Sequence, residues 1–302
     1  MLRILANDGM DKAAVDHLQS LGHEVCLDTY SIEELKTELK DFDAIVIRSA
    51  TKIRAELIDA VAGSRLKLIV RAGVGVDNID VKYAEEKGIT VRNTPYSSSA
   101  SVAELTLAHM FSVARFVGVA TATMRNGEWN KKAYKGTEIS GKTLGLIGFG
   151  RIAQEVARKA TVLGMRVVYF DHHPIEHSIS GCTAESMEDV IKEADYISLH
   201  VPYIKEIGPI IQKEQFDMMK DGVYLINCAR GGVVKEADLL DALNSGKVAG
   251  AGIDVFEEEP TKNMELINHP LVSATPHIGA STKEAQERIG VETYNVILEE
   301  LA

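Results

Sequence analysis

The sequence has 302 residues, of which 45% are hydrophobic and 25% charged. This composition excludes a mainly disordered or fibrous chain, and the length favours about two domains. The 33 basic and 44 acidic residues give a net charge of −11, which argues against nonspecific binding to nucleic acid or to an anionic membrane surface. No apolar run approaches the ~18 residues of a membrane span. The three cysteines, Cys26, Cys182 and Cys228, are scattered and have no metal-ligand spacing. We therefore expect a cytoplasmic, metal-free protein with reduced thiols.

Two series of alternating strands and helices follow one another along the chain. In the first, short apolar runs predict parallel strands at 2–6, 24–28, 44–48, 67–71 and 89–92. Turn-forming residues then occupy 93–99, and an S-x-x-E capping box at Ser101 and Glu104 predicts the start of a long helix. The second series predicts strands near 143–148, 166–171, 196–200, 223–227, 250–254 and 272–275. A second capping box, from Ser281 to Glu284, predicts a final helix that runs close to Ala302.

A glycine-rich turn follows the predicted strand at 143–148. Residues 148–153 read G-F-G-R-I-A, a helical segment comes next, and Asp171 closes the following strand. Such glycines let the backbone approach a pyrophosphate at a helix N-terminus, while the acid accepts hydrogen bonds from the adenosine ribose. Since Asp171 would repel a 2′-phosphate, the pattern predicts NAD rather than NADP. The alternative is a glycine turn that serves only strand–helix packing.

Three charged residues follow the ends of predicted strands in the second series, where open α/β sheets bind ligands. Arg230 precedes two glycines, Glu259 ends an acidic run before a proline, and His277 lies between turn-forming residues. A single histidine is more often a surface or core residue. Because Arg230 and Glu259 also follow the ends of predicted strands, His277 is a candidate catalytic residue.

Eight motifs identify a family by their content and order; they lie at 48–52, 71–78, 93–95, 101–105, 145–152, 227–232, 254–260 and 276–282. With them the sequence resembles the D-isomer-specific 2-hydroxyacid dehydrogenases and, within that family, the D-3-phosphoglycerate dehydrogenases in a short form without a C-terminal regulatory domain. The resemblance implies two doubly wound parallel-sheet domains: a Rossmann NAD-binding domain at 95–276 inserted into a flavodoxin-like substrate domain formed by 1–94 and 277–302. It also implies a nicotinamide cleft between them and a homodimer.

The resemblance also implies roles for individual residues. His277 would be the acid/base, Glu259 its orienting carboxylate, and Arg230 the group that binds the substrate carboxylate, helped by the backbone around Val74 and Gly75. An imidazole, with an ordinary pKa of about 6.5, suits proton transfer near working pH, and a neighbouring carboxylate fixes its tautomer. The residues that the resemblance implies for NAD are Gly148, Gly150, Arg151, Ile152, Asp171, Val201, Cys228, Ala229, Asp254, Gly279 and Ala280.

Some positions depart from the family's pattern. Val74 replaces a common Thr or Ser, and residues 203–208 lack the usual Thr-rich loop, which weakens the expected adenine-side contacts. The adjacent His172 and His173 precede Pro174 and, without a nearby acid or cysteine partner, favour a solvated loop over a metal site. Trp129 is the only tryptophan; core packing and a subunit contact both stay open for it.

Two arginines at predicted strand ends bear on the substrate. Arg48 and Arg71 would face the ligand-binding edge of the first sheet, and guanidinium groups bind phosphate in bidentate fashion. The alternative is that either one pairs with a nearby acid. Inside the motifs at 48–52 and 71–78 the two together favour phosphate, with Thr51 and Lys52 as helpers.

We therefore expect NAD-dependent oxidation of 3-phospho-D-glycerate to 3-phosphooxypyruvate, the first step of serine synthesis in the family that the chain resembles. Reduction of glyoxylate, hydroxypyruvate or another 2-oxoacid is the alternative. A non-catalytic NAD-sensing scaffold like the C-terminal-binding protein corepressors is less favoured, because those proteins carry extra terminal regions. Since the chain ends with the helix that Ser281 opens, we also expect no serine feedback through a regulatory domain.

Overall fold

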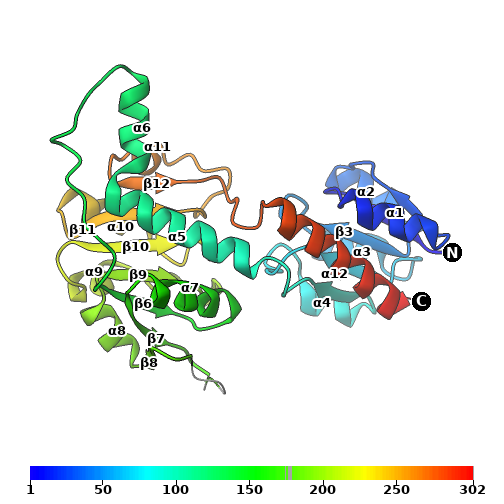
Figure 1. Cartoon of the computed structure of the whole chain (residues 1–302). Coiled ribbons are helices and arrows are strands. Elements are labelled where there is room, and N and C mark those ends of the chain that lie inside the picture. The colour runs from blue at the N-terminus through cyan, green and yellow to red at the C-terminus, as the bar shows by residue number, and fades with distance from the viewer. Residues whose placement is uncertain (174, 176–178, 302) are drawn as a thin grey trace. The chain divides into compact units, whose positions relative to one another are not determined.

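The computed structural model describes residues 1–173, 175 and 179–301, so Pro174 and Ala302 lie outside the described part. The chain divides into two compact units, Met1–Ser98 with Ala280–Ala302, and Ser99–Gly279 (Figure 1). The boundaries expected from the sequence follow residues 94 and 276. His277, expected at the start of the returning segment of the first unit, lies instead in the second unit.

The first unit is built on a five-stranded parallel sheet. The order β2-β1-β3-β4-β5 is that of flavodoxin-like folds, and the five strands predicted from the sequence are present. The register pairs Ile4 with Ala44 and Ile47 with Arg71, which brings the carboxyl ends of neighbouring strands to one edge. The strands are β1 (Arg3–Ala6), β2 (Glu24–Cys26), β3 (Ala44–Ile47), β4 (Leu68–Arg71) and β5 (Thr90–Asn93).

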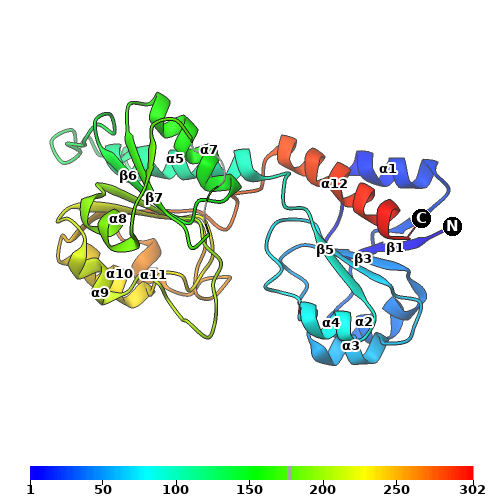
Figure 2. The same cartoon turned by 90° about the horizontal axis from the view of Figure 1, so that it is seen from below.

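Helices cover both faces of this sheet, with α1 and α12 on one face and α2, α3 and α4 on the other (Figure 2). Alternate residues of each strand serve the two cores: Ile45 packs with α2 and α3, whereas Val46 packs with α1 and α12. The last helix begins at Lys283, and the Ala285 N–H donates to Thr282 Oγ1 at 3.1 Å, so Thr282 rather than Ser281 caps it. The helical segments are α1 (Lys12–Ser20), α2 (Ile32–Glu38), a 3₁₀ turn (Leu39–Asp41), α3 (Ala55–Val61), α4 (Val81–Glu86) and α12 (Lys283–Leu301).

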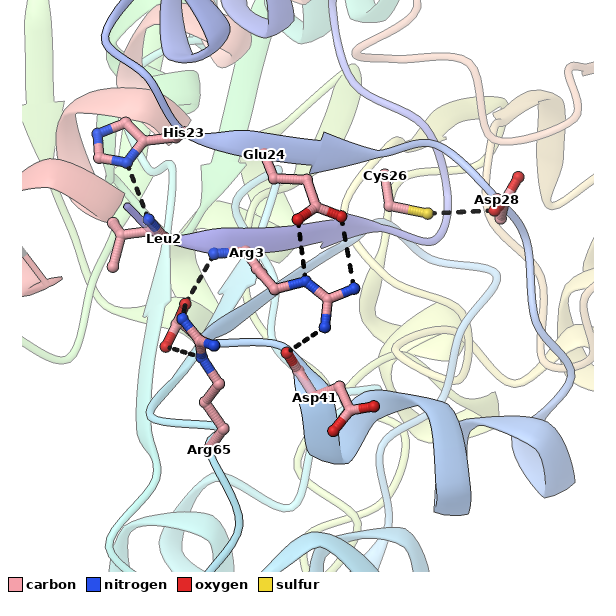
Figure 3. Close-up of polar contacts among 9 residues, drawn as sticks. Leu2, Arg3, His23, Glu24, Cys26, Asp28, Asp41 and Arg65 are labelled. Atoms are coloured by element: carbon pink, nitrogen blue, oxygen red, sulfur yellow. Dashed lines mark hydrogen bonds and ion pairs between the residues drawn. The ribbon is translucent and has the colours of Figure 1, made fainter.

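Hydrogen bonds and ion pairs of charged side chains connect the strands at the amino-terminal edge of the first sheet. The Arg3 guanidinium donates to Glu24 through Nε at 3.0 Å and to the Asp41 carbonyl at 3.0 Å (Figure 3). Asp43 accepts from the Arg3 N–H at 2.7 Å and from Arg65 Nε at 2.6 Å. Burial raises the pKa of Asp43, but the Arg65 and Arg3 hydrogen bonds and the charge of Arg65 outweigh it, and the pKa lies below its ordinary value.

The second unit is built on a seven-stranded parallel sheet in the order β12-β11-β10-β9-β6-β7-β8, which is the Rossmann order with one strand added beyond the sixth. The six strands predicted here are present. An additional strand, β8, is a three-residue edge strand that was not predicted from the sequence and pairs Val167 with Cys182. The strands are β6 (Thr143–Ile147), β7 (Arg166–Phe170), β8 (Cys182–Ala184), β9 (Tyr196–Leu199), β10 (Val223–Asn227), β11 (Val248–Ile253) and β12 (Val272–Ala274).

The helix that opens the second unit begins earlier than the capping box predicted, because Ser101 lies inside it. A left-handed Phe116 (φ 57°) separates α5 from α6. Within the described residues no single helix is long and apolar enough to cross a membrane, and α5 with α6 pass that test only as a pair bent by 65°. The helices are α5 (Ser99–Arg115), α6 (Val117–Arg125), α7 (Arg151–Val162), α8 (Met187–Glu193), α9 (Lys213–Met218), α10 (Glu236–Asn244) and α11 (Met264–Ile267).

Candidate active site

The glycine-rich turn lies where the strand order of the second sheet reverses, between β6 and its neighbours β7 and β9. Gly148 adopts φ +86°, and a Cβ at this position would lie 2.4 Å from the His200 carbonyl oxygen and 2.8 Å from Val201 Cγ1. Its N–H donates to the Phe170 carbonyl at 2.8 Å. The turn is therefore held tightly against the ends of β7 and β9, at the position where doubly wound sheets bind nucleotides.

The residues after Gly148 fit a dinucleotide. Gly150 is the N-cap of α7 and has no side chain to cover the first turn, and a Cβ built on it would meet no described atom within 4 Å. The first-turn N–H groups, those of Arg151 and Ile152 among them, and the positive end of the helix dipole thus face open space that suits a pyrophosphate. The role of Arg151 and Ile152 in binding the pyrophosphate stays a prediction.

Asp171 follows β7 and is fixed by its own backbone surroundings. Oδ2 accepts from the Phe149 N–H at 2.6 Å, and Oδ1 accepts from the His173 N–H at 2.9 Å. An ionised carboxylate has about four acceptor sites, so Asp171 keeps capacity for the two ribose hydroxyls of NAD. His172 and His173 are exposed, as the solvated-loop interpretation predicts.

Asp254 follows β11 and organises the loop that carries His277. The carboxylate is 1% exposed and accepts from Thr275 Oγ1 at 2.6 Å, the Ile278 N–H at 2.8 Å and the Gly279 N–H at 2.9 Å. The His277 N–H donates to the Asp254 carbonyl at 2.8 Å. These bonds hold His277 at φ 52°, a left-handed conformation that non-glycine residues adopt only when their surroundings enforce it.

His277 and Glu259 form a hydrogen-bonded pair. Nδ1 of His277 lies 2.8 Å from Oε2 of Glu259, and the two side chains are 36% and 35% exposed. The other oxygen, Oε1, accepts from the Phe256 N–H at 3.1 Å. Burial raises the pKa of Glu259, but the His277 hydrogen bond, the His277 charge and the Arg230 charge together lower it below its ordinary value. Because the carboxylate accepts from Nδ1–H, the lone pair of the neutral ring is on Nε2, available for a substrate proton.

Arg230 completes the group. Its backbone is fixed by Asn227, whose amide donates to the Arg230 carbonyl at 3.0 Å, and its Nη1 donates to the Ala229 carbonyl at 2.6 Å. A Cβ on the next residue, Gly231, would lie 1.7 Å from the Phe256 carbonyl oxygen, so the backbone after Arg230 packs against the segment that leads to Glu259. The second unit therefore brings Arg230, Glu259 and His277 together beyond the carboxyl ends of β10, β11 and β12.

Cys228 and Ala280 were also predicted to bind NAD. Burial raises the pKa of the Cys228 thiol to about 12, so this side chain contributes shape rather than reactivity. Ala280 belongs to the first unit, and its carbonyl accepts from Gln286 Nε2 at 2.9 Å.

The loop that follows β3 in the first unit, from Arg48 to Thr51, is held by several hydrogen bonds. Asp8 Oδ2 accepts from the Arg48 N–H at 2.7 Å and from the Thr51 N–H at 3.1 Å, while Asn78 Nδ2 donates to both carbonyls at 2.7 Å. Thr51 is buried, donates to Asp8 Oδ1 at 2.6 Å and accepts from Asn7. The expectation that Thr51 helps to bind phosphate is therefore wrong, because its hydroxyl holds the loop. Lys52 is exposed.

Arg71 lies over the loop that follows β4. A Cβ on Gly73 would lie 1.3 Å from Arg71 Nη1, so only glycine admits the guanidinium there. The Thr94 N–H donates to the Gly73 carbonyl at 3.0 Å, and Asn93 Nδ2 donates to the Val74 carbonyl at 2.5 Å. The loop containing Val74 and Gly75 is thus fixed at the same sheet edge as Arg48.

Two further residues, Trp129 and His109, could not be placed from the sequence alone. Trp129 is 77% exposed, which makes core packing wrong for this residue. His109 was not singled out, although it contacts both Ser273 and Thr275 below the His277 loop. The partners are far from His109 in sequence, and no local motif connects them.

Residues 107–279 match the family model described as D-isomer specific 2-hydroxyacid dehydrogenase, NAD binding domain. A hydroxypyruvate reductase from Thermotoga maritima is 46% identical over 303 residues, covering 99% of this chain and 98% of that protein. A D-3-phosphoglycerate dehydrogenase from Methanocaldococcus jannaschii is 44% identical over 293 residues, covering 96% of this chain and 56% of the relative. The chain thus spans just over half the length of that relative.

A solved structure shares the fold over nearly the whole chain. D-Lactate dehydrogenase from Aquifex aeolicus, complexed with NAD and lactic acid, superposes with a TM-score of 0.84 at 32% identity, covering 99% of this chain and 97% of the other. The match includes both units and a structure that holds NAD.

Proposed function

Because this chain belongs to the D-isomer-specific 2-hydroxyacid dehydrogenase family, whose NAD-dependent chemistry it shares, we propose that it oxidises 3-phospho-D-glycerate to 3-phosphooxypyruvate. The observation that carries the catalytic part of this proposal is the hydrogen bond between His277 and Glu259, with Arg230 beside them. The phosphate part depends on Arg48 and Arg71 of the first unit.

In this proposal His277 Nε2 removes the proton from the C2 hydroxyl of the substrate. Glu259 holds the ring through Nδ1 and stabilises the imidazolium that forms. Arg230 binds the substrate carboxylate as a planar fork and, in the reverse direction, polarises the carbonyl. NAD, when bound, would supply the acceptor for the hydride that leaves C2, and Asp254 would help to hold its nicotinamide carboxamide.

The phosphate would be bound in the first unit. Arg48 Nε is buried and has no hydrogen-bond partner among the described residues, and a buried donor without an acceptor is costly. A phosphate oxygen supplies that acceptor, and Arg71 and the exposed Lys52 add positive charge in a chain whose net charge is −11.

A reductase for hydroxypyruvate or glyoxylate is the second candidate. The hydroxypyruvate reductase of Thermotoga maritima is similar to this chain over nearly the full length of both proteins, and the His277 site serves either substrate. The two candidates differ in their need for a phosphate site.

The test is an NADH-consumption assay across phosphooxypyruvate, hydroxypyruvate, glyoxylate, pyruvate and 2-oxoglutarate, ranked by kcat/KM. Arg48→Ala should raise KM for phosphooxypyruvate at least tenfold, about 1.4 kcal/mol, and leave KM for hydroxypyruvate nearly unchanged. Lys67→Ala, an exposed basic residue at the opposite edge of the sheet, is the control. Equal losses on both substrates would return Arg48 to a structural role and favour the reductase, whereas absence of any turnover would favour an NAD-sensing scaffold.

We also propose that the enzyme is a cytoplasmic homodimer that supplies serine synthesis. Every residue of α6 is at least partly exposed, and Val117, Met124 and Trp129 are 54%, 53% and 77% exposed. Large apolar side chains exposed on one short segment support a subunit interface there. Trp129→Ser with Met124→Lys should shift the sedimentation coefficient from that of a dimer to that of a monomer, and an unchanged value would contradict this interface.

A further inference from the structure

A buried histidine of α5 connects that helix to the strand and loop before His277. His109 is 2% exposed, and its Nδ1 lies 3.0 Å from Ser273 Oγ while its Nε2 lies 3.0 Å from Thr275 Oγ1. Ser273 belongs to β12, and Thr275 follows that strand. Thr275 in turn donates to Asp254 Oδ1 at 2.6 Å. A continuous chain of hydrogen bonds thus runs from β12 through His109 to Asp254.

The proton positions in this chain follow from the donors available. The Thr275 hydroxyl has one hydrogen, which it gives to the carboxylate of Asp254, so Thr275 Oγ1 must accept from His109. Nε2 of His109 therefore bears a hydrogen. Burial lowers the pKa of His109 against the opposing charge of Asp254, which favours the neutral ring, and in that ring Nδ1 is the acceptor for the Ser273 hydroxyl.

We propose that His109 is a positioning residue for catalysis, which fixes the Thr275 hydroxyl toward Asp254 and thereby holds the loop of His277 in its working conformation. Asp254 accepts from Thr275, Ile278 and Gly279. Without His109 the Thr275 hydroxyl is free to rotate, and one of these three bonds weakens. The inference rests on the proposed role of His277 as the acid/base, although its structural part does not.

The tautomer is directly measurable. In protein labelled with ¹⁵N-histidine, we expect one buried ring, absent from the spectrum of His109→Leu, to carry its hydrogen on Nε2 and to be neutral at pH 8. A hydrogen on Nδ1 of that ring would overturn the proposed direction of the chain.

Substitutions then separate positioning from packing. His109→Leu should speed hydrogen exchange at the amides of His277, Ile278 and Gly279 and lower kcat roughly 10- to 100-fold, as small displacements of reacting groups do. His109→Gln places an amide N–H where Nε2 stands and should restore both readouts in large part. Val113→Ala, also buried on α5, is the packing control and should leave exchange at the three amides and kcat near wild type.

Thr275→Val removes the next hydroxyl in the chain and keeps its shape, and it provides a second route if His109→Leu folds poorly. The double variant Thr275→Val with His109→Leu should lose no more kcat than Thr275→Val alone, since both act through one connection. Additive losses, or unchanged exchange at the three amides in His109→Leu, would overturn the inference. If instead His277→Ala keeps full activity, the proposed acid/base fails, while the exchange and tautomer measurements still test the role of His109 in the loop.

Discussion

Gly148 and Gly150 lie two residues apart in the same turn, but an added methyl group should act on them in different ways. At Gly148, an alanine must adopt φ +86°, which costs about 1–2 kcal/mol. Its Cβ would also lie 2.4 Å from the His200 carbonyl oxygen, a backbone atom that cannot rotate away, and such overpacking costs about 1–3 kcal/mol more. Gly148→Ala should therefore destabilise the second unit by roughly 2–5 kcal/mol.

Gly150→Ala is the matched control. Its φ of −70° suits any residue, and the Cβ enters open space, so the melting temperature should change little. That space is where a pyrophosphate would lie, so the Kd for NAD should rise. Calorimetry and NAD titration on both variants test this expectation. The melting temperature of Gly148→Ala should fall by about 4–20 °C, because a unit of this size loses ~2–4 °C per kcal/mol. A Gly148→Ala protein that melts within about 1 °C of wild type, or a Gly150→Ala protein that binds NAD normally, would refute the reasoning.

Three further expectations concern catalysis, cofactor choice and acid stability. His277→Ala and Arg230→Ala should each lower kcat/KM severely, by ~10²–10⁴-fold for the acid/base, while NAD titration stays close to wild type; a His277→Ala enzyme within a few-fold of wild type would contradict the mechanism. Asp171 should make kcat/KM with NAD far exceed that with NADP, and equal values would oppose the ribose contact. Asp43, whose pKa is lowered in the fold, stabilises the protein above its unfolded pKa of about 3.9 and loses this effect as pH falls through its folded pKa. Asp43→Asn should thus lower the urea midpoint more at pH 7 than at pH 3, and an equal loss would mean that the Arg65 ion pair contributes nothing.

The central strands, such as β3 and β9, could be predicted from the sequence because they are mainly apolar runs buried on both faces. Residues 182–184 carry no such signal, since this edge strand pairs on one side only and is mostly exposed. Helix starts were less predictable. Ser101 and Glu104 have the capping spacing but lie inside α5, and of the adjacent hydroxyls at 281 and 282 only tertiary structure selects Thr282.

The charged groups of the candidate site followed from a rule of parallel sheets, that side chains after the strands gather at one edge. Arg230, Glu259 and His277 could be found in this way. Residues that support them could not, because their partners come from distant segments. Asn7 and Asp8 decide the role of Thr51, and His109 meets Ser273 across 164 positions of the chain.

The first unit is completed by α12, a helix that follows the whole second unit in the chain. Ile289 and Ile297 of α12 are buried in the same core as strands β1, β3 and β4, and burying two such side chains stabilises that core by about 3–6 kcal/mol. During translation the sheet of the first five strands therefore stays incomplete until the whole second unit has left the ribosome. Until then α1 is the only helix on one of its faces.

The second unit has all its strands before that point and is able to fold first, as domains generally do during synthesis. The nascent chain would then carry a finished nucleotide-binding unit next to an unfinished, apolar sheet. The interval during which the first sheet stays incomplete is therefore set by the length of the inserted unit rather than by the complexity of either sheet.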